Sequence, residues 1–328
     1  MYEKIYSNPD IYKIYVPLPN NPLKNLNSYV VKTENKNLII DTGFNMPECY
    51  ESLTEGLKEL EIDIEKSEMF LTHMHSDHIG LAPFVMNANS VIYMSKIDYD
   101  RLHNDSPEYS WDALYRKFIS EGFPKEAIAQ LHKSNPAEAY APEKSFSAVT
   151  LKDGDKIKIG NYEFTAILTP GHTPGHMCLY LEEEKLMFLG DHVLFDITPN
   201  ITFWTGVRDS LKDYIDSLNK IKKFDVETAL PAHRKNEMDF YIRIDQIIKH
   251  HHERLAECLN IIKNNPGLHA YDIAGFMKWS MRGKNWAEFP MHQKWFAVGE
   301  TIAHTDYLRC QNKIYRKLEN GIYKYYAF

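Results

Sequence analysis

Cysteine is scarce in this chain. Only four cysteines occur in 328 residues, with no C-x-x-C pair among them: Cys49, Cys178, Cys258 and Cys310. Such scattered positions argue against a disulfide framework and against a cysteine-based zinc site. They suit a reducing compartment, so we expect a cytoplasmic protein.

Long apolar runs and an excess of positive charge are also missing. No uninterrupted apolar run approaches the length that spans a membrane, and the start of the chain lacks the basic and apolar regions of a signal peptide. Lys and Arg number 38 against 45 Asp and Glu, which gives a net charge of −7. No global positive field therefore favours nucleic acid or anionic membrane, although a local basic patch stays open.

One short stretch concentrates side chains that can bind a metal. His73, His75, Asp77 and His78 follow the apolar run 69–72, which we expect to form a buried strand. Side chains alternate along a strand, so His73 and His75 point to the same side. Imidazole and carboxylate are ligands that zinc accepts. Packing these groups without a cation would leave unpaired polar groups at about 1–3 kcal/mol each, so the stretch predicts a metal site.

Three further expected strands end in a histidine or an aspartate. Residues 162–168 lead to His172, residues 185–189 lead to Asp191, and residues 226–230 lead to His233. Metal and substrate sites are commonly built at such strand ends. Together with the first histidine stretch, four separate strands thus deliver a histidine or an aspartate to their ends.

Three neighbouring polar residues have a different expected role. Asp41 directly follows the expected strand 37–40, which suggests a partner that orients a ligand histidine rather than a ligand itself. His176 is expected to hold its loop by hydrogen bonds, and His192 to line the site.

The chain divides into two expected domains, at residues 1–236 and 237–328. Residues 99–145 interrupt the first domain as a polar, aromatic and helical insertion. A connection of this length is often a lid or a binding wall. A packed helical decoration without contact to substrate is an equal alternative.

The second domain is expected to contain three helices and a terminal hairpin. The helices are expected near 239–264, 270–279 and 292–308, and the hairpin turns at Asn320-Gly321. The run His250-His251-His252 lies on the first of these helices. Consecutive helical residues diverge in direction, so we interpret the run as a solvated face and not as a metal site.

The whole set of motifs resembles the metallo-β-lactamase superfamily. The matching pieces occur in the family's order: Asp41-Thr42-Gly43, His73-x-His75-x-Asp77-His78, Pro170-Gly171-His172-Thr173, Gly190-Asp191 and His233. The resemblance implies an α+β fold, the αββα sandwich of two mixed sheets with helices outside. The smaller, mainly helical C-terminal domain looks like the winged-helix module that some members append.

The resemblance also implies how metal ligands divide. One ion would be held by His73, His75 and His172. The second would be held by Asp77, His78 and His233. Asp191 would bridge the two ions together with a water or hydroxide, as in glyoxalase II. Position 191 is not the cysteine of much-studied β-lactamases, and position 75 is not the glutamate of flavodiiron oxidoreductases, so hydrolysis is favoured over electron transfer.

The resulting functional hypothesis is a binuclear metal-dependent hydrolase. A metal-bound hydroxide would attack a small acyl substrate, which could be a thioester, a lactone or a lactam. The cofactors are two divalent ions, zinc being expected and iron or manganese being alternatives. Asp77 could serve as a proton shuttle besides being a ligand.

Two other activities share parts of this pattern. A metal-dependent endoribonuclease is one alternative, because a relative with a similar C-terminal module cleaves RNA. A mononuclear iron persulfide dioxygenase is the other, because it shares the first histidine cluster. The expected partner is a small-molecule substrate, with no membrane, and a homodimer through the C-terminal domain is an open possibility.

Overall fold

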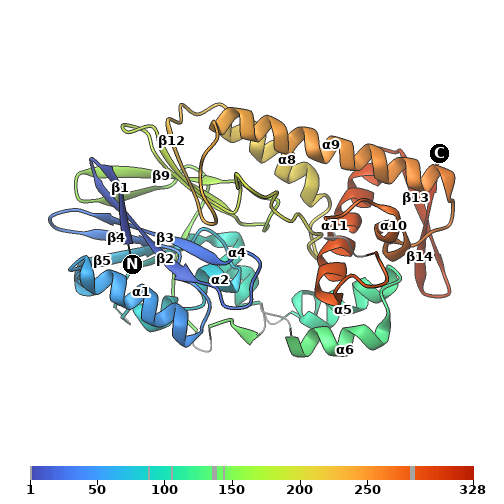
Figure 1. Ribbon diagram of the computed structural model, residues 1–328, viewed down its shortest axis with the longest axis horizontal. Helices are drawn as coiled ribbons and strands as arrows, with labels where there is room; N and C mark the ends of the chain where they lie inside the picture. Colours follow the sequence, from blue (N-terminus) through green and yellow to red (C-terminus); the bar gives the residue numbers. More distant parts are fainter. Residues whose placement is uncertain (1, 88, 105, 135–138, 143–144, 281–284) are drawn as a thin grey trace. The chain divides into compact units, whose positions relative to one another are not determined.

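The computed structural model describes residues 2–328 except 88, 105, 135–138, 143–144 and 281–284 (Figure 1). The chain forms two compact units. Unit 1 contains residues 1–103, 136–199 and 219–244, and unit 2 contains residues 104–135, 200–218 and 245–328. Most of the expected insertion thus groups with the C-terminal helices, and its residues 105, 135–138 and 143–144 lie outside the described part. The domain boundary at residue 236 stays a prediction.

Two mixed β-sheets form the framework of unit 1, and they confirm the expected fold class. The first sheet has the strand order β1 (Tyr2–Ser7), β2 (Asp10–Pro17), β3 (Asn25–Lys32), β4 (Asn37–Ile40), β5 (Ser67–Phe70), β6 (Ile92–Ser95) and β7 (Val149–Leu151). The second has the order β12 (Thr228–Pro231), β11 (Leu186–Gly190), β10 (Met177–Leu181), β9 (Tyr162–Leu168) and β8 (Lys156–Ile159).

Alternating side chains on the first sheet supply two apolar layers. Tyr29 and Val31 of β3 face a core shared with the second sheet, and the Tyr29 ring lies 5.4 Å from the ring of Phe188 on β11. Val30, between them, faces a separate core that contains Leu53. This leucine belongs to α1 (Pro47–Glu59), which packs along β2 (Figure 1). The period of two along β3 therefore decides which side chains join the sheets and which receive the helix.

The described residues of unit 1 also form three short helices and one helical turn. They are η1 (Ile64–Lys66), α2 (Ser76–Ile79), α3 (Ala82–Val85) and α4 (Lys96–Leu102). The side chain of Ser95 accepts a hydrogen bond from the Asp98 N–H and caps the start of α4. This cap fixes where Asp98 lies, which matters for the site below.

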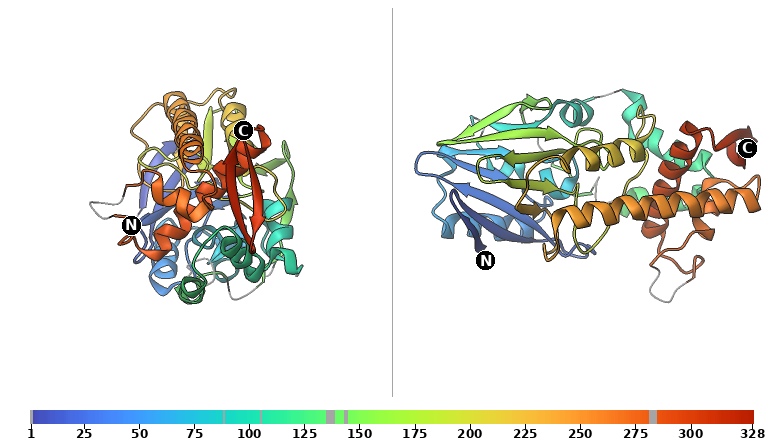
Figure 2. Two further views of the ribbon diagram at one scale, coloured as in Figure 1. Left: turned by 90° about the vertical axis from the view of Figure 1, so that its right-hand side faces the viewer. Right: turned by 90° about the horizontal axis from the view of Figure 1, so that it is seen from above.

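Unit 2 is mainly helical and ends in a hairpin, as expected. Its elements are η2 (Pro107–Tyr109), α5 (Trp111–Ser120), α6 (Lys125–Ser134), α10 (Ala270–Phe276), α11 (Met291–Cys310), β13 (Ile314–Glu319) and β14 (Ile322–Ala327). Asn320 and Gly321 make the hairpin turn with positive φ. Figure 2 shows the hairpin in red next to the C-terminus. The winged-helix likeness stays a prediction.

Two long helices contribute residues to both units. They are α8 (Ser210–Ile221) and α9 (Phe240–Asn264). Helix α9 is predicted from the sequence, whereas α8 is not, although Leu211, Tyr214 and Leu218 repeat at helical spacing and are buried. No helix among the described residues is long and apolar enough to cross a membrane.

The interpretation of His250-His251-His252 as a solvated face is wrong for its central residue. His251 is completely buried, and its ring lies 5.5 Å from the ring of Tyr214 and 5.5 Å from that of His304. His252 is exposed. Neighbouring helical residues do diverge, but on a helix packed on one side that divergence turns one of the three inward.

Candidate metal centre

The polar strand ends of unit 1 meet at one edge of its two sheets. β4 and β5 run parallel, so Asp41 and the loop that carries His73 leave the first sheet at the same edge. β11 and β12 run parallel in the second sheet, so Asp191 and His233 also leave at a common edge. Parallel strands end together, which explains how residues far apart in sequence converge.

All seven sequence-predicted ligand residues lie in one cluster. Their ligand atoms form three overlapping groups, in each of which the atoms lie within 4.8 Å of one another: His73, His75 and His172; His73, His78 and Asp191; Asp77, His78 and His233. The expected grouping of three histidines on one side is thus present in the geometry. His78 and Asp191 connect it to the other side.

In the first group, His75 lies between two other imidazoles. Its Nδ1 atom is 3.0 Å from His73 Nε2 and 3.0 Å from His172 Nε2. A ring nitrogen carries a proton or a lone pair, and one Nδ1 proton can serve only one of these neighbours. A cation bound among the three lone pairs would satisfy all of them together.

One carboxylate, that of Asp191, connects the two sides of the cluster. Asp191 Oδ2 lies 3.5 Å from His172 Nε2, whereas Oδ1 lies 3.3 Å from His233 Nε2 and 3.7 Å from His78 Nε2. Asp77 Oδ2 lies 3.5 Å from His233 Nε2. The two oxygens of Asp191 therefore face different histidine groups, as expected of a bridging ligand.

The protonation of the histidines differs between the two sides. Burial lowers the pKa of His73 well below its usual value, and the neighbouring imidazoles add to this effect. Burial acts in the same direction on His78, but the carboxylates of Asp41, Asp77 and Asp191 outweigh it and raise the pKa of His78 to about 10. Neutral imidazole is the ligand form, so the first side is prepared for a metal by its apolar surroundings.

Three buried atoms that face the cluster make no hydrogen bond among the described residues. They are His78 Nε2, Asp191 Oδ1 and His233 Nε2. Buried polar groups of native proteins almost always have partners, and a bound ion would supply one partner to all three of these neighbouring atoms. The seven residues therefore fit a divalent metal, by donor type and by the direction of these unsatisfied atoms.

Asp41 orients one of the histidines, as the sequence predicted. Its Oδ2 atom lies 2.7 Å from His78 Nδ1 and accepts a hydrogen bond from Thr72 Oγ1 at 2.8 Å. Its Oδ1 atom accepts from the Thr72 N–H at 2.9 Å. A carboxylate can only accept here, so Nδ1 of His78 carries a proton and donates it to Asp41. Nε2 is the ring nitrogen directed at the cluster, and a metal that binds there would displace its proton.

His176 holds its loop by hydrogen bonds, also as predicted. Its Nε2 accepts the N–H of Asp191 at 3.1 Å, and its Nδ1 lies 2.8 Å from Thr169 Oγ1. Gly190 permits this close approach, because a Cβ atom there would lie 2.5 Å from His176 Nε2. His192 is completely buried, with its ring 5.8 Å from the ring of His176, and its expected position lining the site stays a prediction.

Asp98 is a buried carboxylate that the sequence reasoning missed. It accepts hydrogen bonds from the Met74 N–H at 3.1 Å, from Thr173 Oγ1 at 2.7 Å and from the Gly175 N–H at 2.7 Å. It therefore joins the loop of His73 and His75 to the loop of His172. Only its position three residues after the helix-capping Ser95 signals a structural role, and that pattern occurs at many helix starts.

Several known proteins are similar to this chain. An atrochrysone carboxyl ACP thioesterase of Emericella nidulans is 30% identical over 216 residues, which are 66% of this chain and 53% of the relative. The lactamase-like protein adaB of Aspergillus niger is 25% identical over 243 residues, 74% of this chain and 60% of the relative. The chain thus spans about half to three fifths of the length of these fungal relatives.

A crystal structure supports the fold over the whole chain. A metallo-beta-lactamase family protein from Thermus thermophilus superposes with a TM-score of 0.80 at 24% identity, covering 97% of this chain and 98% of that one. Residues 286–328 match the model of the metallo-beta-lactamase-like C-terminal domain. Residues 22–233, which include every residue of the cluster, match the model of the metallo-beta-lactamase superfamily. The chain belongs to the metallo-beta-lactamase superfamily.

Proposed function

We propose that the protein is a binuclear metal-dependent hydrolase of acyl thioesters. One observation carries the proposal: seven histidine and aspartate side chains form three overlapping ligand groups joined by Asp191. The thioester is favoured over the lactone and the lactam because a relative that is 30% identical over 216 residues is an ACP thioesterase.

The ligands divide in this proposal as in glyoxalase II. His73, His75 and His172 would hold one ion, Asp77, His78 and His233 would hold the other, and Asp191 would be shared between them. All seven are imidazoles or carboxylates, which suit zinc, with iron or manganese as alternatives. When bound, two divalent ions lower the pKa of a water and polarise the substrate carbonyl.

The protein's own residues prepare the reaction in three ways. Burial keeps the first imidazoles neutral and therefore able to bind. Asp41 and Asp98 hold the ligand loops in place, so little reorganisation accompanies the reaction. Asp77 offers one oxygen to the side of His233 at 3.5 Å, and its second oxygen can accept a proton and deliver it to the leaving thiolate.

The experiment combines metal counting with a substrate panel. The protein is loaded with zinc, manganese or iron, and hydrolysis of an acyl thioester, a lactone, a lactam and RNA is compared. We expect two ions per chain and preferential thioester turnover, lost in His73→Ala and retained in the exposed control His252→Ala. Turnover of RNA alone would contradict the proposal, and one iron per chain with persulfide oxidation would favour a dioxygenase.

The cellular location and the role of unit 2 are also part of the proposed function. All four cysteines are free thiols, which fits the cytoplasmic location that we propose. We also propose that unit 2 serves either substrate binding or self-association. Size-exclusion chromatography of the full chain distinguishes a monomer from a homodimer.

A further inference from the structure

A cavity in unit 2 gathers positive charge in a chain that is acidic overall. The cavity has a volume of about 290 Å³, and its lining includes four cationic side chains and one carboxylate: Lys117, Arg208, Arg309, Arg316 and Asp306. The whole chain carries a net charge of −7. Four cations around one small space are therefore not a by-product of general basicity.

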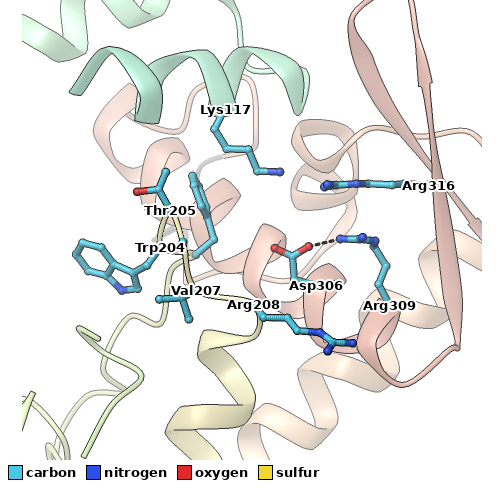
Figure 3. A pocket seen from close by; sticks show the side chains of 10 residues that line it. Lys117, Trp204, Thr205, Val207, Arg208, Asp306, Arg309 and Arg316 are labelled. Atoms are coloured by element: carbon cyan, nitrogen blue, oxygen red, sulfur yellow. Dashed lines mark hydrogen bonds and ion pairs between the residues drawn. The ribbon is translucent and has the colours of Figure 1, made fainter. Parts of the chain in front are cut away.

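The cationic groups come from separate elements and reach into one space. Lys117 extends from α5, Arg316 from β13 and Arg309 from the end of α11, while Arg208 precedes α8. Figure 3 shows the ends of Lys117 and Arg316 facing each other, with the Arg309–Asp306 pair beside them. Like charges brought together by folding repel one another, so an anion among them lowers the free energy.

Internal carboxylates neutralise only part of this charge. Glu121 lies 2.5 Å from Lys117 Nζ and 3.2 Å from Arg316 Nη1, and it also accepts a hydrogen bond from Tyr325. Asp306 lies 2.6 Å from Arg309 Nη1. Two carboxylates against four cations leave a net charge of +2.

Arg208 has the greatest freedom to meet a ligand. Its side chain is exposed, and within the described part of the chain it forms no ion pair or hydrogen bond. By contrast, the Arg316 guanidinium is fixed 3.8 Å from the centre of the Tyr323 ring. The cavity thus combines a guanidinium held in place with one that can close on a bound anion.

We propose that this cavity binds phosphate groups of a phosphorylated thioester carrier. Guanidinium groups match the oxygens of phosphate with paired hydrogen bonds, and a lysine adds a point charge. Phe203, Trp204 and Val207 also line the cavity and give part of its wall an apolar character. The cavity volume is near the lower end of the range for small-molecule sites. It is larger than a lone phosphate needs.

The choice of a thioester carrier rests on the proposed function. Acyl thioesters are carried either on coenzyme A or on the phosphopantetheine arm of a carrier protein, and both carriers bear phosphate esters. An acyl-thioester hydrolase with a separate phosphate site would recognise the carrier independently of the acyl group. The site therefore predicts a preference for phosphorylated over phosphate-free thioesters.

Calorimetry on the metal-loaded full chain tests the site without any hydrolysis. The probes are adenosine 3′,5′-bisphosphate and a phosphopantetheine phosphodiester, with adenosine and pantetheine as phosphate-free counterparts. We expect binding of a phosphorylated probe only, weakened roughly tenfold or more by Arg208→Glu. The control Lys249→Glu reverses an exposed charge that does not line the cavity and leaves the affinity unchanged.

The two phosphorylated probes distinguish the two carriers. Preferential binding of the bisphosphate identifies coenzyme A, and preferential binding of the phosphodiester identifies a carrier protein. Both measurements are repeated in His73→Ala, where binding through Arg208 persists if the cavity is the site. Affinity that is insensitive to Arg208→Glu, or an RNA oligonucleotide bound more tightly through Arg208 than either probe, overturns the proposal.

Kinetics separate failure of this site from failure of the proposed function. Arg208→Glu should raise KM for a coenzyme A thioester with kcat unchanged, and should not affect the corresponding pantetheine thioester. Thioester hydrolysis with no effect of Arg208→Glu leaves the function intact and refutes the site. Phosphate binding through Arg208 without any thioester hydrolysis leaves the site intact and refutes the function.

Discussion

Replacement of Asp41 by asparagine tests whether the orientation of His78 controls metal binding. Asp41 is almost completely buried, and the three contacts of its carboxylate all need an acceptor: the Thr72 N–H, Thr72 Oγ1 and His78 Nδ1. An asparagine keeps the shape but places an NH₂ group at one of the two oxygen positions. At the Oδ1 position that group faces the Thr72 N–H, and at the Oδ2 position it faces His78.

Either arrangement disturbs the cluster. Two donors face to face leave a buried donor unsatisfied, at about 1–3 kcal/mol. If His78 instead changes tautomer, its proton moves to Nε2, the atom that faces Asp191 at 3.7 Å. Loss of such a supporting contact typically weakens metal affinity about 10–100-fold, or roughly 1.4–2.7 kcal/mol.

A chelator competition measures this effect directly. The affinities of the wild type and Asp41→Asn for zinc are compared. The control, Asp10→Asn, alters an exposed ion pair with Lys4 and a hydrogen bond from Tyr12 Oη. We expect one of the two ions to bind about 10–100-fold more weakly in Asp41→Asn and the control to match the wild type. Two ions bound with wild-type affinity in Asp41→Asn would refute the assigned role.

Three further predictions concern stability. Removing the ions with a chelator should lower Tm, because the ions bind only the folded cluster, and added zinc should restore Tm. A Tm that does not change with zinc would contradict the proposed metal site. Gly190→Ala should destabilise by about 1–3 kcal/mol in denaturant unfolding, because its Cβ would lie 2.5 Å from His176 Nε2, whereas Gly154→Ala meets no atom within 4 Å. Burial lowers the pKa of His304 from 6.5 to about 3. Unfolding therefore takes up a proton at His304 below pH 6.5, so the free energy of unfolding falls by about 1.4 kcal/mol per pH unit as the pH is lowered. His304→Gln should reduce this slope. An unchanged slope would contradict a neutral, buried His304 in the folded protein.

The cluster could be predicted from the sequence because its signals are local. His73 and His75 directly follow a short apolar strand, and an alternation of two residues suffices to place them on one side. Asp41 occupies the same kind of position after β4. Parallel pairing then brings these strand ends together, and the family resemblance supplied the order in which the distant pieces combine.

The features that escaped prediction depend on contacts between distant segments. The three donors that bind Asp98 come from residues 74, 173 and 175, so nothing near Asp98 in sequence announces them. The burial of His251 depends on which side of α9 is covered, and Tyr214 and His304 cover it. The cationic cavity likewise joins residues 117, 208, 309 and 316, which no short motif contains.

The contacts of Asp98 have a practical consequence for protein engineering. The segment that carries His73 to His78 looks portable, since it is short and contains four donor groups. Its backbone is nevertheless fastened through Asp98 to the loop of His172, and Asp98 is positioned by the Ser95 cap of α4. Transplanting the histidine segment into another scaffold therefore requires the connection from β6 to α4, which carries Ser95 and Asp98, or another acceptor that makes the same hydrogen bonds.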